Sequence, residues 1–346
     1  KLDVNKVFEN LRKIMEVEGK GAIEKKISYI SELLSNASGR EAKYIIRTLL
    51  GDLRIGVASG TIRDSLAEAF FEKDKKDMRD KIEEAYDLAN DLAVVFDASS
   101  KGKKAIEEIS ITPGKPIRVM LPVKVLDIEE AFRICGKPAA LEHKYDGFRM
   151  IISKNGKEIK LFTRKLENVT KQFPDVVEAV KENVKGGSYI LDSEVVGYDP
   201  KTKRYRPFEA ISQRIKRKYN IDKLMNDIPV EINIFDIVYY NNKSTMNSPF
   251  KDRRKIIDKA VKTVPWKIRP SFQIVTDDEE KANSFYADAL KIGEEGIMIK
   301  NLDAPYKQGR RVGYMTKLKP IVNDLDLVIV GAEYGSGKRG GLLTSY

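Results

Sequence analysis

The spacing of apolar residues changes once along this chain of 346 residues, and the change limits the folds that it can adopt. From Val4 to about Ala98 apolar residues recur at the spacing of amphipathic helices. Between Ile111 and Val123 closely spaced prolines and a glycine interrupt that pattern. Beyond this stretch, short alternating runs rich in Ile, Val, Phe and Tyr predict strands, with a few helices between them such as Phe173 to Glu182 and Lys251 to Lys262. We therefore expect several domains, with an all-α region followed by an α+β region.

Local end signals define one helix of the first region. Ser38 and Glu41 have the spacing of a capping box, and Gly51 stands where a left-handed residue would end the helix. The connector from Arg54 to Gly60 leads into another predicted helix, Thr61 to Phe71. Its glycines leave backbone N–H groups open to an anion near a helix start. A phosphate contact and an ordinary turn between helices are both compatible with this segment.

The composition narrows the possible chemistry. With 63 Lys and Arg against 52 Asp and Glu, the net charge of +11 favours a polyanionic partner such as nucleic acid. Cys135 and His143 are the only residues of their types, which excludes an intrachain disulfide and leaves almost no material for Cys/His zinc sites or for Ser-His or Cys-His catalytic pairs. No apolar run approaches the roughly 18 residues of a membrane span, so no membrane partner is expected. Catalysis here must use Lys, Arg and carboxylates.

Both ends of the sequence suggest that the chain is part of a longer protein. It begins at Lys1, and a predicted strand from Asp326 to Ala332 is followed by too few residues to close another core. We expect a fragment at both ends.

A Lys-x-Asp-Gly tetrad, Lys144 to Gly147, precedes a predicted hairpin whose turn is Asn155–Gly156. Pairing Lys154 with Lys157 would give this hairpin one apolar face. On the other face, Arg149 and Arg164 would converge beside Lys144, in an arrangement suited to forked contacts with phosphate or ribose oxygens. The tetrad by itself fits equally well a solvated lysine before a turn.

Three further predicted strands carry charges. Asp192 and Glu194 share one face of an apolar strand and could hold a hard cation, and Glu295 enters another such strand. Mg²⁺ could draw on Glu194 and Glu295 together. Lys317 and Lys319 point the same way in an extended chain. Each alone also fits an edge strand with an outward charge.

Taken together, these residues predict nucleophilic catalysis by a lysine at a phosphorus centre. A lysine amine is mostly protonated near neutral pH and needs nearby positive charge, a metal or partial burial to become the free nucleophile. Lys317, Lys319 and the arginines could supply that positive charge. The same cations would stabilise the transferring phosphoryl group and a pyrophosphate leaving group.

At this point the sequence resembles the covalent nucleotidyltransferases, specifically the ATP-dependent DNA ligases of the archaeal and eukaryotic replicative type. The family's motifs match, in order, Glu142-His143-Lys144-Tyr145-Asp146-Gly147, Phe162-Thr163-Arg164, Leu191-Asp192-Ser193-Glu194, Ile234-Phe235-Asp236, Glu295-Gly296-Ile297-Met298-Ile299-Lys300 and Lys317-Leu318-Lys319. The resemblance implies an enzyme of DNA replication, repair and recombination.

The resemblance also implies a role for each matched residue. Lys144 would attack the α-phosphate of ATP and carry AMP, Glu142 would contact the adenine amino group, and Phe235 would stack on the adenine ring. The remaining roles cover the ribose, the phosphates and the metal. Arg149 and Arg164 would hold phosphate and ribose, Glu194 the ribose hydroxyl, Glu194 and Glu295 the metal, and Arg311, Lys317 and Lys319 the phosphates, with Lys300 a further member.

For the domains, the resemblance implies the later part of a helical DNA-binding domain in residues 1–112, with Arg54, Gly56 and Gly60 touching DNA phosphates. An adenylation domain with antiparallel sheets would occupy residues 113–322, and the opening of an OB-fold β-barrel residues 323–346. The implied cofactors are ATP and Mg²⁺ or another divalent cation.

The implied partner is nicked double-stranded DNA, sealed by AMP transfer to the 5′-phosphate and attack by the 3′-hydroxyl. A sliding clamp would bind through N-terminal residues outside this sequence. We expect a monomer, in the cytoplasm with the nucleoid if the source is archaeal and in the nucleus if it is eukaryotic.

Three alternatives stay open at this stage. An RNA ligase or an RNA-capping guanylyltransferase would share the motifs, although such enzymes usually begin near the catalytic domain. A non-catalytic nucleic-acid-binding protein would explain the basic charge without any chemistry. An NAD-dependent ligase would carry a cluster of zinc-binding cysteines, which this sequence lacks.

Overall fold

A computed structural model describes residues 2–17, 19, 21–216, 221–309, 312–320, 328–335 and 340–346. The chain divides into two compact units, Lys1–Glu83 and Glu84–Tyr346. The division falls within helix α5 (Lys75–Ala89), whereas the predicted boundary lies near residue 112. The predicted domain limits therefore stay predictions.

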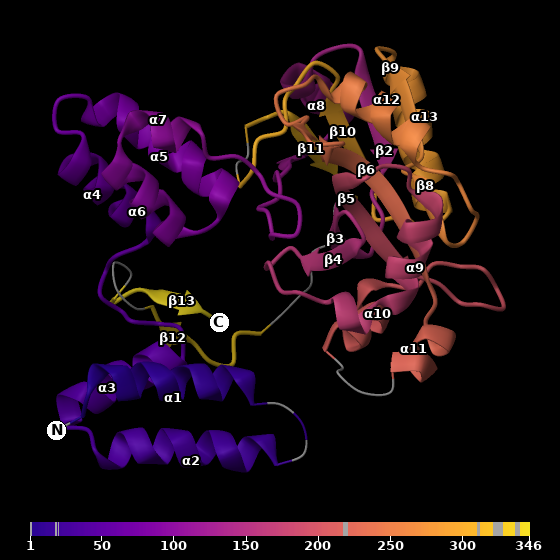
Figure 1. Cartoon of the computed structure of the whole chain (residues 1–346). Helices are drawn as coiled ribbons and strands as arrows, with labels where there is room; N and C mark the ends of the chain where they lie inside the picture. The colour runs from indigo at the N-terminus through magenta and orange to yellow at the C-terminus, as the bar shows by residue number, and fades with distance from the viewer. Residues whose placement is uncertain are drawn as a thin grey trace. The chain divides into compact units, whose positions relative to one another are not determined.

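The first unit is helical (Figure 1), as the apolar spacing predicts. Its helices are α1 (Val4–Glu16), α2 (Ala22–Ser35), α3 (Gly39–Leu49) and α4 (Ser59–Phe70). The capping box is confirmed, since Ser38 and Glu41 bond each other's backbone N–H groups at the start of α3. Gly51 has a φ of 70° directly after the last turn, as a left-handed end residue requires.

Helix α5 continues into the second unit, where α6 (Leu92–Lys101) and α7 (Lys103–Glu107) follow it and precede an extended stretch, residues 109–122. This stretch is where the prolines end the helical pattern. It packs against the α+β part, because Ile117 and Met120 share a buried cluster with Ile151. The N–H of Gly114 also donates to the hydroxyl of Ser153 at 2.7 Å. The region read as a boundary therefore forms part of a core.

Two sheets form the centre of the α+β part (Figure 1). One sheet has the strand order β1-β11-β10-β2-β9, and the other has the order β4-β3-β5-β6-β7, with β8 beside β6. The strands are β1 (Val123–Val125), β2 (Ala139–His143), β3 (Phe148–Asn155), β4 (Glu158–Thr163), β5 (Ser188–Gly197), β6 (Val230–Tyr240), β7 (Lys243–Ser244), β8 (Ile268–Pro270), β9 (Gln273–Thr276), β10 (Ile297–Asn301) and β11 (Met315–Leu318). Pairing is antiparallel except between β1 and β11 and between β6 and β8, so both sheets are mixed.

Four helices pack on the outer faces of the two sheets, namely α8 (Ile128–Cys135), α9 (Pro174–Asn183), α12 (Phe250–Ala260) and α13 (Glu279–Lys291). Helices α10 (Phe208–Lys216) and α11 (Ile221–Asp227) lie between β5 and β6 in the sequence. The core of the six-stranded sheet includes Val176 of α9 and Ile257 of α12. The core of the five-stranded sheet includes Phe132 of α8 and Phe285 of α13. A third core contains residues of both sheets, such as Ile151 and Met315. The inner faces of the two sheets therefore face one another.

The β3–β4 hairpin forms, but its predicted register is wrong by two residues. Lys154 pairs with Ile159 instead of Lys157, so that Gly156 and Lys157 make the turn. Gly156 has a φ of 59° and takes the first central position, as glycine does in a type II′ turn. Because a shift of two residues keeps each side chain on its face, Met150 is still in the core that α9 and α12 form with the six-stranded sheet.

At the chain's end, two short strands, β12 (Glu333–Tyr334) and β13 (Leu343–Ser345), pair with each other. The predicted strand Asp326–Ala332 is not formed over residues 328–332, and its first two residues lie outside the described part. The beginning of an OB-fold in this segment stays a prediction.

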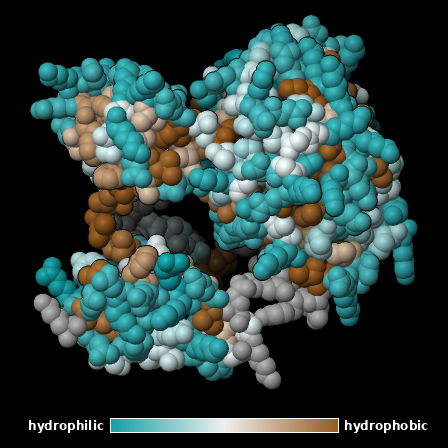
Figure 2. Space-filling model, in the orientation of Figure 1, coloured by the Kyte–Doolittle hydropathy of each residue, from teal (hydrophilic) through white to brown (hydrophobic). Residues whose placement is uncertain are grey.

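On the face shown in Figure 2, hydrophilic residues cover most of the surface, with apolar residues scattered among them. Within the described ranges, no helix is both long and apolar enough to cross a membrane.

Candidate active site

A cavity of about 890 Å³ lies in the α+β part, lined by residues of both sheets. Nearly all of the predicted nucleotide and metal residues line it, namely Glu142, Lys144, Arg149, Arg164, Glu194, Phe235, Glu295, Lys317 and Lys319, together with Lys300. Arg311 lies outside the described residues. Arg54, Gly56 and Gly60 belong to the other unit. Residues spread over almost 180 positions of sequence are thus brought to one place.

Backbone pairing fixes the position of Lys144, which directly follows β2. Its N–H donates to the carbonyl of Gly296 at 2.9 Å, and its own carbonyl accepts from the N–H of Glu295 at 2.9 Å. These bonds continue the β2–β10 ladder past its last assigned pair, Ile297 with His143. Glu295 therefore lies just before β10, and the prediction that it sits within the strand is wrong.

The Lys144 ammonium forms an ion pair with one carboxylate oxygen of Glu295, and the Lys319 ammonium contacts the other oxygen. Lys317 and Lys319 both line the cavity, while Leu318 between them is buried in the core that α8 and α13 form with the five-stranded sheet. This confirms that the two lysines share a direction. One carboxylate thus holds two lysine side chains side by side.

Two glycines allow the strands to approach closely enough for this arrangement. Gly296 has a φ of 141°, and a Cβ there would overlap the carbonyl oxygen of Leu318. A Cβ at Gly147 would overlap the carbonyl oxygen of Val195 on β5. Only glycine fits either position without moving backbone atoms.

Burial shifts the protonation of the charged groups here. It lowers the pKa of Lys144, although the negative charges of Glu194 and Asp146 oppose the change. The pKa of Lys319 is lowered by burial and by the charge of Lys144. Burial also raises the pKa of Glu194 to about 8. The free amine of Lys144, the form that can act as a nucleophile, is therefore favoured relative to an exposed lysine.

At another wall of the cavity, a buried ion pair holds Glu142. Lys300 Nζ lies 2.6 Å from one carboxylate oxygen, and Gln273 Nε2 donates to the other at 2.8 Å. Lys300 also donates to the carbonyl of Phe235 at 3.1 Å and lies 4.7 Å from the centre of its ring. Lys300, which sequence reasoning ranked as a secondary member, joins the two residues predicted to recognise adenine.

Arg149 does not offer the free fork that the sequence predicted. Its Nε and Nη2 atoms donate to the two carboxylate oxygens of Asp192 at 2.8 and 2.6 Å. Asp192 is fully buried and also accepts from the Tyr306 hydroxyl. Asp192 is therefore committed to these partners, and the idea that it holds a cation with Glu194 is wrong. The Arg149 guanidinium lies 5.3 Å from the centre of the Phe235 ring.

Arg164 follows β4 and is exposed where it lines the cavity.

His143, to which sequence reasoning gave no role, packs its ring against Phe272 and Phe285, each at 5.0 Å between ring centres. Burial lowers its pKa to about 4.

Sequence reasoning missed several residues of this site. Helix α10 lines the cavity with Phe208, Glu209, Ser212 and Ile215, and the N–H of Phe208 donates to Asp146 at 3.3 Å. Gln273 and Tyr306 were also missed. The spacing of the α10 residues fits a helix face, but nothing local in the sequence distinguishes a face that lines a cavity from one that packs in a core.

In the helical unit, Arg54 is exposed and forms an ion pair with Asp52 at 2.8 Å. Helix α4 begins after Ala58, which offers no side-chain cap, and Gly60 lies in its first turn. A phosphate contact at this helix start stays a prediction.

Comparison with known proteins gives a family match in each of the two units of the chain. Residues 119–319, more than half of the sequence, match the family described as "ATP dependent DNA ligase domain", and residues 1–67 match "DNA ligase N terminus". The DNA ligase of Nanoarchaeum equitans is 48% identical over 346 residues, which are 100% of this chain and 60% of that protein. The DNA ligase of Thermococcus fumicolans is 39% identical over 346 residues, covering 100% and 61%.

A solved structure described as "Pmar-Lig_PreS3" has a TM-score of 0.57 at 18% identity, covering 97% of this chain and 68% of that one, which shows a shared fold. This chain spans about 60% of the length of the curated relatives that it matches. The resemblance drawn from the motifs is confirmed, and the chain belongs to the ATP-dependent DNA ligases, of the archaeal type.

Proposed function

We propose that this chain carries the covalent nucleotidyl-transfer chemistry of an enzyme that uses ATP to seal nicks in duplex DNA. The observation that carries the proposal is the cluster of Lys144, Glu295 and Lys319 in one cavity with a partly exposed aromatic ring, that of Phe235. A partly buried lysine with a lowered pKa is the nucleophile that such a reaction requires.

In the first step, the free amine of Lys144 attacks the α-phosphorus of ATP. A nitrogen–phosphorus bond forms, the bond between the α-phosphorus and the bridging oxygen breaks, and pyrophosphate leaves. The Glu295 carboxylate contacts Nζ and can accept the proton that the amine loses. Lys317 and Lys319, with Arg311, would stabilise the negative charge on the phosphates as the bond breaks.

The base of ATP would be recognised at the opposite wall. The Phe235 ring offers a stacking surface, and Glu142 offers carboxylate oxygens to the adenine amino group. Lys300 and Gln273 hold that carboxylate in a fixed orientation. Arg149, Arg164 and Glu194 would contact the ribose and the phosphates from the six-stranded sheet.

In the next two steps, AMP would pass from Lys144 to the 5′-phosphate of a nick, and the adjacent 3′-hydroxyl would then displace AMP. Residues 1–112 would bind the duplex, with Arg54, Gly56 and Gly60 at backbone phosphates, which positions DNA without reading its sequence. Residues 113–322 would form the adenylation domain, and residues 323–346 would begin an OB-fold.

A divalent cation fits this donor set. Mg²⁺ is commonly bound by one or two carboxylates together with substrate phosphates, and Glu194 and Glu295 line the same cavity. The described residues contain no group of three or more His, Cys, Asp or Glu that could hold a metal alone. Glu194 and Glu295 would therefore hold the cation jointly with ATP, and its charge would neutralise phosphate oxygens.

Because the matched relatives are archaeal DNA ligases, we infer that the protein acts on nicked DNA of the nucleoid, in the cytoplasm. That it acts as a monomer stays a prediction. A sliding clamp as a further partner stays a prediction.

Mass spectrometry of the protein incubated with ATP and Mg²⁺ tests the proposal. We expect one added AMP, bound at Lys144, and loss of that AMP on exposure to nicked duplex DNA. Labelling by GTP and not by ATP would favour a capping-type enzyme. No adduct with either nucleotide would overturn the proposal.

A further inference from the structure

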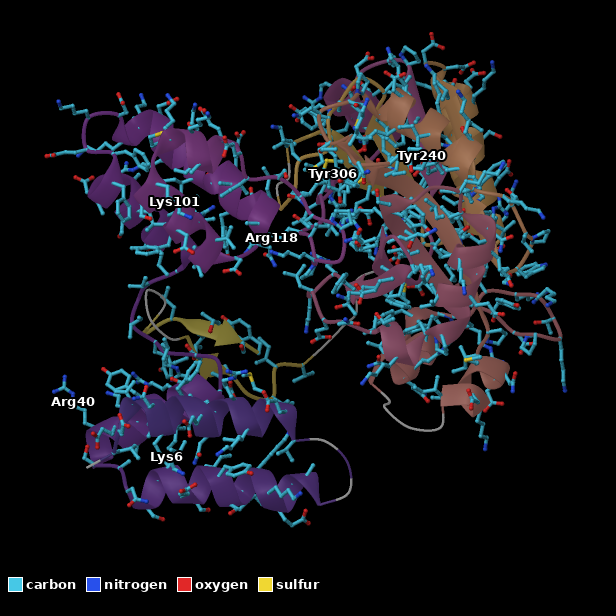
Figure 3. The ribbon with its side chains drawn as sticks, viewed as in Figure 1. Lys6, Arg40, Lys101, Arg118, Tyr240 and Tyr306 are labelled. Carbon is cyan, nitrogen blue, oxygen red and sulfur yellow. The ribbon has the colours of Figure 1, made fainter. Side chains whose placement is uncertain are left out.

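Tyr306 lies in the segment that joins β10 to β11, far in sequence from β3 and β5, the strands that hold Arg149 and Asp192. Its side chain is only 1% exposed, in the core shared by the two sheets. The residue is labelled in Figure 3, among the side chains of the α+β part. It does not line the cavity, so its influence on the site must act through another residue.

The Tyr306 hydroxyl makes two strong contacts. It donates to Asp192 Oδ2 at 2.6 Å and accepts from the N–H of Met120 at 3.1 Å. The bond from the N–H of Met120 would by itself satisfy the need of a buried hydroxyl for a hydrogen-bond partner. The donated bond goes to a fully buried carboxylate whose other partner is Arg149, a residue of the cavity wall.

These contacts leave Arg149 little freedom. A guanidinium has five N–H groups. Nε and Nη2 use one each on Asp192, and Nη1 uses one on the carbonyl of Met120 at 2.7 Å. Nη2 also lies 3.4 Å from the Tyr306 hydroxyl oxygen. At least one N–H, on Nη1, is left without a partner among the described residues.

We infer that Tyr306 is a positioning residue of the nucleotide site. Its hydroxyl fixes the Asp192 carboxylate, and Asp192 fixes the plane of the Arg149 guanidinium beside the Phe235 ring. Arg149 then presents one N–H, at a set angle, to an oxygen of the ATP ribose or phosphates. The inference rests on the proposed function, because it assumes that ATP occupies the cavity.

Without the hydroxyl, Asp192 keeps only Arg149 as a side-chain partner, and the guanidinium can turn with it. A hydrogen bond to a charged group contributes more than one between neutral groups. Part of that contribution should appear as weaker ATP binding, because the loosened arginine must be ordered again when ATP binds.

The test compares Tyr306→Phe with Tyr189→Phe. Tyr189 is a matched control: it is fully buried on β5, the strand of Asp192, and its hydroxyl has no partner in the described part of the chain. Both changes are made in a Lys144→Ala protein, so that ATP binds without reacting. Isothermal titration calorimetry then gives the dissociation constant for ATP with Mg²⁺, and the fluorescence of Trp266, the only tryptophan, gives the unfolding midpoint.

We expect Tyr306→Phe to weaken ATP binding about 10-fold and Tyr189→Phe less than about 2-fold. If Tyr306 acts through Asp192, adding Tyr306→Phe to Asp192→Asn should change the dissociation constant less than about 2-fold, because the partner of the hydroxyl has already been altered.

Equal dissociation constants for Tyr306→Phe and Tyr189→Phe would overturn the inference, even if the unfolding midpoint of Tyr306→Phe falls, because that result indicates a role in packing only. Additive effects of Tyr306→Phe and Asp192→Asn would also overturn it. If the Lys144→Ala parent binds no ATP, the proposed function fails, and the inference fails with it.

Discussion

The helical unit and the cavity of the α+β unit use the same charged residue types in different surroundings. In the helical unit, Arg54 and Asp52 pair with 69% and 56% of their side chains exposed. In the cavity, Lys300 and Glu142 pair with 3% and 2% exposed. Water and salt screen the first pair, so it can open at little cost to bind another group. The second pair is fixed, because neither charge can be left alone in a buried site.

This difference separates two ways of binding phosphate. Exposed cations such as Arg54 can exchange partners and suit a duplex held at any sequence. The buried network of the cavity holds a few groups in one geometry, as a covalent reaction at one phosphorus atom requires. Changes in the cavity should therefore abolish chemistry or stability, and changes in the helical unit should only weaken DNA binding.

The largest expected effect is that of Lys144→Ala. Removing the nucleophile should reduce formation of the AMP adduct by at least about 1,000-fold. Lys255→Ala is the control, since Lys255 is exposed and pairs only with the nearby Asp252 in the described structure. Mass spectrometry with ATP and Mg²⁺ measures the adduct. An adduct that persists in Lys144→Ala would show that another residue is the nucleophile.

The next effect is that of Lys300→Met, which removes one of the two cationic partners of the buried Glu142 carboxylate and leaves Arg254, whose Nη1 lies 3.4 Å from it. We expect the free energy of unfolding of the α+β unit to fall by about 1.5–3 kcal/mol. Urea unfolding followed by Trp266 fluorescence measures this value, since Trp266 lies in that unit. The double change Glu142→Gln and Lys300→Met removes both charges and should recover part of the loss. A loss below about 1 kcal/mol for the single change is what an exposed ion pair would give, and it would contradict the difference stated between the buried pair and the exposed pair of Arg54 and Asp52.

A smaller effect concerns pH and the single histidine. Burial lowers the pKa of His143 from 6.5 to about 4, so between these values the unfolded chain binds a proton that the folded chain does not. The contribution of His143 to the free energy of unfolding should therefore fall by about 1–3 kcal/mol as the pH drops from 6.5 to 4. Glu194 and Glu294, whose pKa values burial raises to about 8 and about 7, contribute in the opposite direction.

His143→Phe, which suits the surrounding Phe272 and Phe285, should lack this component. Urea unfolding of both proteins across the same pH range isolates it. Identical pH dependence in the two proteins would show that His143 is not protected in this way.

The smallest effect is expected for Arg54→Ala in the helical unit. Loss of one phosphate contact should weaken binding to nicked DNA by about 2–5-fold, equally for different sequences. It should also reduce the slope of the logarithm of the binding constant against the logarithm of the salt concentration by about 1. Arg12→Ala, an exposed arginine in the same unit, is the control. Fluorescence anisotropy at several salt concentrations gives both values. A loss of AMP-adduct formation in Arg54→Ala would contradict the expectation that changes in the helical unit weaken only DNA binding.

Several parts of the fold followed from local pattern. The capping box at Ser38 and the left-handed Gly51 set the ends of α3, because the partners in both devices are a few residues apart. The helices predicted at Phe173–Glu182 and Lys251–Lys262 are α9 and α12, within two residues at each end. The hairpin was predicted correctly in kind but not in register, because both registers place the same side chains on the same face.

The sequence by itself determined which residues carry reactive or charged groups and which face of each strand they occupy. Those properties depend on residue type and on a spacing of two or a few positions. The tertiary structure decided which of these groups are in contact. Backbone pairing brings Glu295 to Lys144, and Arg149 binds Asp192 instead of a free anion. The Tyr306 hydroxyl donates to the same Asp192 carboxylate. Such meetings depend on which distant strands lie side by side and at what register, and the local spacing of residues does not encode that.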